Sequence, residues 1–141
     1  MRILVAAFTY VSLLVAGSNT ERDNTSLESL YPEKDRFIQH QQEWQMNFYH
    51  KRIDEFKSSP IGASKIVFLG NSITEAGGDW NKRFVSANKI VNRGISGDIT
   101  EGVLSRLDEI IHYKPIAVFI LIGINDIINA DLPDRHKITP L

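Results

Sequence analysis

The sequence predicts an α/β domain built on a parallel sheet, and three observations carry that prediction. Short apolar runs at residues 66–69, 90–91 and 116–122 have the length and composition of buried strands. A helical pattern separates the second run from the third, and a turn rich in Gly or Asn follows each run. Strand, helix and strand in this order imply parallel pairing with right-handed crossovers. The last run is apolar without a break, which is typical of a central strand covered on both faces.

The first 18 residues have the layout of a signal peptide. Arg2 precedes an uncharged apolar run, which ends in the small residues Ala16, Gly17 and Ser18. The run is shorter than the roughly 20 residues that a membrane-spanning helix needs. We therefore expect a secreted or periplasmic protein without a stable membrane span, with an uncleaved anchor or a first buried strand as the alternative.

Residues 19–60 are expected to hold a polar linker and one amphipathic helix. The linker extends to about Tyr31, Pro32 begins a helical pattern, and the pattern ends near Ser58. Aromatic and apolar residues recur at near-helical spacing: Phe37, Trp44, Phe48, Ile53 and Phe56. This stripe predicts a face that docks on the main domain, which residues 61–141 supply.

The connection between the second and third strands is predicted to be a single helix. Asp98, Ile99, Thr100 and Glu101 fit a capping box at its start. One face of the helix is then apolar: Val103, Leu104, Leu107, Ile110 and Ile111.

Composition excludes several classes of function. The 141 residues include 16 Lys and Arg against 17 Asp and Glu, so no net field favours nucleic acid as a partner. Cysteine is absent, and the four histidines (His40, His50, His112 and His136) lack the i, i+4 spacing of a helical metal site. We expect neither a metal nor another cofactor, so catalysis would depend on Ser, His or carboxylates.

Three polar segments follow the three strands and should meet at one edge of the sheet, because parallel strands end on the same side. They are residues 70–74, 92–98 and 123–126. Ser72 comes directly after a strand, where a nucleophile projects from the edge. The N–H groups of Ser72 and Gly97 and the amide of Asn125 are candidate donors to an oxyanion. A phosphate-binding or purely structural loop is the alternative, although GxGxxG and GxxxxGK[ST] are both absent.

These segments resemble the conserved blocks of the SGNH (GDSL-like) hydrolases. Gly70-Asn71-Ser72 resembles the first block, which usually reads Gly-Asp-Ser, Gly97 the second, and Gly123-Ile124-Asn125-Asp126 the third. The resemblance implies a flavodoxin-like three-layer parallel sheet, preceded here by the N-terminal helix. It also implies a carboxylic ester hydrolase with Ser72 as nucleophile and with Ser72, Gly97 and Asn125 forming the oxyanion hole. Its substrates would be short-acyl or acetyl esters of carbohydrates or other polar molecules.

The chain departs from the family at two places. Asn71 replaces the usual Asp, a variant that resembles carbohydrate-active esterases of the family. The Asp-x-x-His block that carries the general base is not found before Leu141, and His136 is interpreted as a surface-loop residue. The resemblance therefore implies a C-terminally truncated fragment that is poorly stable and nearly inactive by itself.

Two other functions remain open. One is a non-catalytic binding or structural module on the SGNH scaffold, and the other is a flavodoxin-like binder of phosphate or a cofactor.

Residues after Gly77-Gly78 are expected near the pocket mouth: Asp79, Trp80, Asn81 and Arg83. Trp80 is interpreted as a core aromatic, with stacking on a sugar as the alternative.

Overall fold

Three parallel strands form the sheet of the structure, a computed structural model that describes residues 27–85 and 89–130. They are β1 (Ile66–Gly70), β2 (Ile90–Gly94) and β3 (Ala117–Leu121), and all three coincide with runs that the sequence predicted as strands. The strand order is β2-β1-β3, with parallel pairing on both sides of β1. The predicted α/β class with a parallel sheet is confirmed.

The strand at the centre of this sheet is β1, so the prediction of a central β3 is wrong for the described part of the chain. Along β3, the side chains of Phe119, Ile120 and Leu121 are 44–51% exposed. In β1, by contrast, Val67 and Leu69 are buried. The unbroken apolar run made β3 look covered on both faces, yet among the described residues it is an edge strand.

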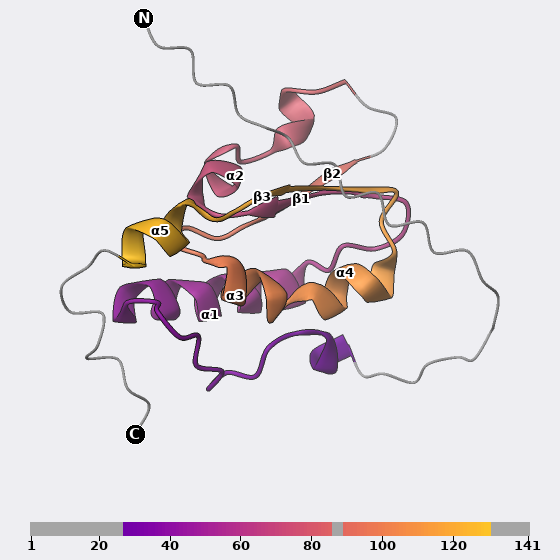
Figure 1. Cartoon of the computed structure of the whole chain (residues 1–141). Helices are drawn as coiled ribbons and strands as arrows, with labels where there is room; N and C mark the ends of the chain where they lie inside the picture. The colour runs from indigo at the N-terminus through magenta and orange to yellow at the C-terminus, as the bar shows by residue number, and fades with distance from the viewer. Residues whose placement is uncertain (1–26, 86–88, 131–141) are drawn as a thin grey trace, which may run out of the picture.

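Helices cover both faces of the sheet (Figure 1). On one face lie α1 (Glu43–Ser58), α3 (Thr100–Leu104) and α4 (Leu107–Tyr113). On the other lie α2 (Ser72–Ala76) and the 3₁₀ helix η2 (Trp80–Lys82), while α5 (Ile124–Ala130) follows the carboxyl end of β3. The layers are those of a doubly wound sheet, on which functional loops gather where the strands end.

Side chains of β1 alternate between the two layers, as strand geometry requires. Val67 and Leu69 pack in a buried cluster with Ile61 and Val103. The side chain of Phe68 contacts the rings of Trp80 and Phe119 instead. Both faces of β1 are therefore covered by side chains.

Helix α1 begins at Glu43 and not near Pro32, although it ends at Ser58 as predicted. His40 adopts a left-handed φ of 69°, which interrupts any helix that would run from residue 32. The capping box that starts α1 joins the side chains and backbones of Gln42 and Gln45. A start at Glu43 has no strong signal in the sequence, since Gln42 occupies the N-cap position where Ser, Thr, Asp or Asn is usual.

Only part of the predicted aromatic stripe faces the domain. Ile53 and Phe56 are buried and Phe48 packs, partly buried, against the same cluster, whereas Trp44 is 55% exposed. Trp44 is in the same helix as Ile53 and Phe56, but the buried line of α1 runs through Gln45, Tyr49, Ile53 and Phe56, and Trp44 is one residue away from it.

The single helix predicted after β2 is two short helices, α3 and α4, separated by Ser105 and Arg106. The predicted capping box is also absent, because the N-cap of α3 is Ile99 and the Asp98 carboxylate binds Arg106. Leu104 and Ile111, expected on the buried face, are 62% and 63% exposed.

The end of the expected linker is folded. Residues Leu27–Leu30 form a short 3₁₀ helix, η1, and both Leu30 and Tyr31 are buried in the cluster that contains Tyr49 and Phe56. The expected signal peptide, residues 1–18, lies outside the described residues.

Candidate functional site

The three predicted polar segments leave the same edge of the sheet. In the strand register, Gly70 lies opposite Gly94 on one side and Leu121 on the other. The strands therefore end level, and the segments that follow them begin side by side, next to α2 and α5 (Figure 1).

Ser72 is the first residue of α2, two residues past the end of β1. Asn71 forms the N-cap, and its Oδ1 accepts the N–H of Ile73 at 3.1 Å. A Cβ at Gly70 would collide with the carbonyl of Leu121 and the hydroxyl of Thr74, so the turn needs glycine there. Ser72 itself is half-buried, and neither its N–H nor its hydroxyl has a hydrogen-bond partner within the described chain.

Gly97 lies in the loop after β2 in a left-handed conformation, with φ 80°. The N–H groups on both sides of it are occupied: that of Ser96 donates to Glu75 Oε2 at 2.7 Å, and that of Asp98 to the Ile95 carbonyl at 3.1 Å. The Gly97 N–H has no acceptor among residues 27–85 and 89–130. The hydroxyl of Ser96 also donates to Glu75 at 2.5 Å, which ties this loop to α2.

Asn125, in the first turn of α5, contacts the same loop. Its Nδ2 donates to the Asp98 carbonyl at 2.8 Å, and an amide nitrogen has a second hydrogen to donate. The neighbouring Asp126 accepts the N–H of Thr100 at 3.0 and 3.1 Å. These bonds dock the third segment on the second, so the structure brings Asn125 next to the Gly97 loop.

A buried ion pair beneath the loops, which the sequence analysis missed, holds them together. Arg106 donates to Asp98 Oδ2 at 2.8 Å, to the Gly70 carbonyl at 3.2 Å and to the Arg93 carbonyl at 2.9 Å. One side chain thus joins the end of β1, the end of β2 and the residue after Gly97. An acid and a base eight residues apart, Asp98 and Arg106, were the only hint of this ion pair in the sequence, and Asp98 was interpreted as part of a helix cap instead.

Asp98 is held in an unfavourable environment for a charge. Complete burial raises the pKa of its carboxyl to about 6, and the Arg106 guanidinium acts in the opposite direction. Gln41 Nε2 and the N–H of Ile99 also donate to this carboxylate, at 3.3 and 3.0 Å. The carboxylate is thus fully engaged in holding the loop.

Arg93, which precedes the Gly97 loop, faces a second buried acid. It donates to both oxygens of Glu109 at 2.7 and 2.9 Å, and Glu109 also accepts the Tyr31 hydroxyl at 2.8 Å. Burial, with this hydrogen bond, raises the pKa of Tyr31 well above its ordinary range. This pair fastens η1 to the sheet.

The residues expected at the pocket mouth after Gly77-Gly78 turn away from the Ser72 edge. Asn81 pairs with the backbone of Ile90, which is at the amino end of β2. The ring of Trp80 packs against Phe68 and Phe84, and its Nε1 donates to the Thr74 carbonyl at 3.0 Å. That packing is consistent with the interpretation of Trp80 as a core aromatic.

None of the three described histidines is hydrogen-bonded to Ser72. His50 and His112 contact the rings of Tyr49 and Tyr113, and His40 lines a small cavity of about 130 Å³ beside Ile99. His136 lies outside the described residues. Within those residues, no three His, Asp or Glu side chains are grouped in a way that could hold a metal ion.

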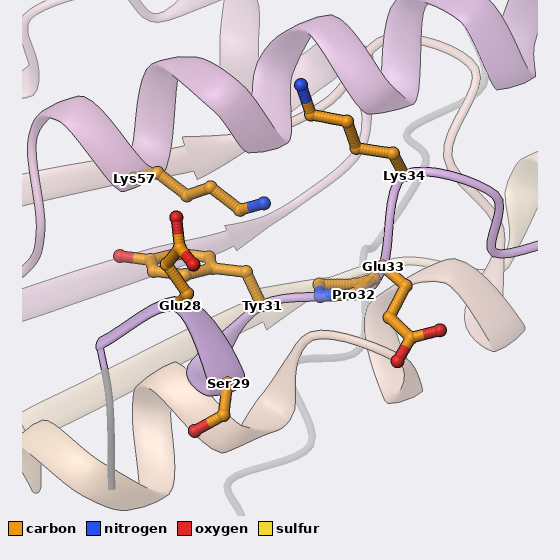
Figure 2. Close-up of a pocket in the computed structure, with 7 residues that line it drawn as sticks. All are labelled: Glu28, Ser29, Tyr31, Pro32, Glu33, Lys34 and Lys57. Carbon is orange, nitrogen blue, oxygen red and sulfur yellow. The ribbon is translucent and has the colours of Figure 1, made fainter.

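A hollow of about 470 Å³ lies on the opposite side of the molecule from α2. Figure 2 shows Lys34 and Lys57 above Tyr31 and Pro32, with Glu28 drawn across the Tyr31 ring and Glu33 below Pro32. It is a surface depression lined by charged side chains of both signs together with Ser29, Tyr31 and Pro32.

No protein-family model matches the chain, and no curated protein matches it. Among the helices of the described residues, none is long and apolar enough to cross a membrane.

Proposed function

We propose that the protein is a serine ester hydrolase of the SGNH type, with Ser72 as the nucleophile. The SGNH assignment is supported by the order of the three sequence blocks and by their position at one edge of a parallel sheet. The proposed substrates are short-acyl esters, such as acetyl esters, of carbohydrates or other polar molecules.

The observation that carries the proposal is the distribution of unpaired donors. In the described part of the chain, the backbone N–H groups of Ser72 and Gly97 lack acceptors, while those of Ile73, Ser96 and Asp98 are occupied. Acyl transfer needs such donors, fixed in advance, for the oxygen that becomes negative in the tetrahedral intermediate. The second hydrogen of Asn125 Nδ2 is the third donor of the set.

In the proposed reaction, Ser72 Oγ attacks the ester carbonyl carbon and loses its proton to a general base. The C–O bond to the alcohol then breaks, the alcohol takes that proton, and water releases the acyl group by the same steps. We assign the base to an Asp-x-x-His segment on the C-terminal side of the described residues. The helix dipole contributes little, since α2 has only five residues.

The test is hydrolysis of p-nitrophenyl acetate by the protein expressed to its natural C-terminus, compared with its Ser72→Ala variant. We expect Ser72→Ala to lower kcat by about 10³-fold or more at unchanged thermal stability. His136→Ala is made in parallel. Because we place the base elsewhere, this variant should keep its activity.

Three results would contradict parts of the proposal. Equal activity of the wild type and Ser72→Ala would remove Ser72 as the nucleophile. Loss of activity in His136→Ala alone would identify a different base. A folded but inactive wild type would favour the non-catalytic binding module.

A further inference from the structure

We propose that Trp44 is the platform on which the ring of a neutral, polar ester substrate lies, beside the oxyanion hole. This inference rests on the proposed function for its location, and it names the part of the substrate that the site recognises. The ring would be a pyranose or a ring of similar chemistry, presented with one flat C–H face to the indole.

Position is the first argument. A Cβ placed on Gly97 would lie 3.1 Å from Cη2 of Trp44 and 2.7 Å from Cγ of Gln45. The indole edge therefore contacts the loop that carries the proposed oxyanion donor. Figure 1 shows the start of α1 on the same side of the molecule as α5 and the carboxyl ends of the strands.

The second argument is that the ring is fixed and yet exposed. Its Nε1 donates to Gln42 Oε1 at 2.7 Å, and Gln42 is held in turn by the capping box with Gln45. Even so, 55% of Trp44 remains exposed. A large aromatic side chain that is oriented by a hydrogen bond but left in solvent offers a preformed surface for a ligand.

The core does not need this ring. Other members of α1, namely Tyr49, Ile53 and Phe56, fill the space against the sheet and are at most 3% exposed. Trp80, the other tryptophan, differs because its ring contacts Phe68, Phe84 and the Arg83 guanidinium. Of the two, only Trp44 combines high exposure with contact to the Gly97 loop.

The charges around Trp44 favour a neutral ligand. From Phe37 to His50 the chain contains no Lys or Arg, and the guanidinium of Arg52, farther along α1, is already engaged by Glu55, Glu75 and the Gly94 carbonyl. The nearby buried side chains are the amides of Gln45 and Asn129, which hydrogen-bond to each other at 3.2 and 3.4 Å.

The experiment compares two acetate esters on the protein expressed to its natural C-terminus. Glucose pentaacetate presents a pyranose ring, and vinyl acetate presents none. For Trp44→Ala we expect kcat/KM to fall about tenfold for glucose pentaacetate and to stay within about twofold for vinyl acetate. Leu27→Ala is the matched control, because Leu27 is 56% exposed and begins η1, which lies away from α5 and the carboxyl ends of the strands (Figure 1).

A binding measurement separates this inference from the proposed function. In the Ser72→Ala protein, glucose pentaacetate should quench tryptophan fluorescence, and the added Trp44→Phe change should remove that quenching. Quenching that depends on Trp44 would support the platform even in a protein without hydrolysis. Equal kinetics for both esters in Trp44→Ala, or quenching unaltered by Trp44→Phe, would overturn it.

Discussion

At the scale of single residues, Asp98 is the group whose charge opposes folding. Burial raises the pKa of its carboxyl to about 6 from an ordinary value of 3.8. The folded state then holds the proton more tightly than the unfolded state. The contribution of Asp98 to stability is therefore greatest below pH 3.8 and falls as the pH rises through about 6, by roughly 3 kcal/mol in all.

Unfolding in urea at pH 4, 5, 6 and 7 tests this prediction. The free energy of unfolding of the wild type, minus that of Asp98→Asn, should decrease as the pH rises. The control is Asp79→Asn, because hydrogen bonds from Asn81 lower the pKa of the exposed Asp79 and any trend should have the opposite sign. If the wild type instead becomes more stable relative to Asp98→Asn as the pH rises, the pKa of Asp98 is lowered by Arg106 more than it is raised by burial.

Gly97 and Gly78 offer a matched pair at the same scale. Both are left-handed, with φ 80° and 59°, but a Cβ would meet Gln45 and Trp44 at Gly97 and open space at Gly78. Gly78→Ala should lower the free energy of unfolding by about 1–2 kcal/mol through backbone strain alone. Gly97→Ala should lower it by about 1–3 kcal/mol more, because its methyl group also displaces the start of α1.

Thermal or urea unfolding of the two variants measures the difference. Equal losses of unfolding free energy in the two variants would mean that Gln45 and Trp44 move aside for the methyl group at position 97 without destabilising the protein. Gly97→Ala should also reduce esterase activity, since it moves the proposed donor, whereas Gly78→Ala should not.

At the scale of elements, the sequence predicted what depends on apolar runs and turn chemistry. All three strands, the end of α1 at Ser58 and the position of Ser72 after β1 are confirmed. These features follow from local composition, which is why one sequence is enough to find them.

Features that depend on distant partners could not be found in this way. Asp98 looked like a cap because Thr100 and Glu101 follow it, but its partner is Arg106 and the N–H of Thr100 is capped by Asp126 from α5. The start of α1 depends on the conformation of His40, which spacing does not reveal. For the site, the sequence predicted that Ser72, Gly97 and Asn125 lie at one edge of the sheet. It did not predict the buried Asp98–Arg106 ion pair beneath them or the position of Trp44 beside them.

At the scale of the whole molecule, the described residues leave the β3 edge of the sheet exposed. Exposed apolar side chains continue from β3 into α5: Phe119, Ile120, Leu121, Ile124, Ile127 and Ile128, each 44–63% exposed. Parallel sheets are normally covered on both faces, and large apolar patches mark surfaces of contact. We infer that further polypeptide covers this patch, in line with the proposed Asp-x-x-His segment.

The patch gives the last prediction, which concerns the 141-residue chain by itself. It should bind the dye ANS strongly and associate at micromolar concentration, because an uncharged edge strand lacks the features that prevent strand pairing. Ile120→Lys with Ile127→Lys should reduce both effects, whereas Leu104→Lys, at a similarly exposed position on α3, should not.

The protein expressed to its natural C-terminus should bind little ANS if further chain covers β3 and α5. Equal dye binding by the two proteins would instead make the patch a surface for a separate partner. A monomeric 141-residue chain without dye binding would show that the apolar edge is protected by residues outside those described. The catalytic proposal needs a folded segment after α5 that carries the general base for Ser72. Low dye binding by the protein expressed to its natural C-terminus would support such a segment, and equal dye binding by the two proteins would count against it.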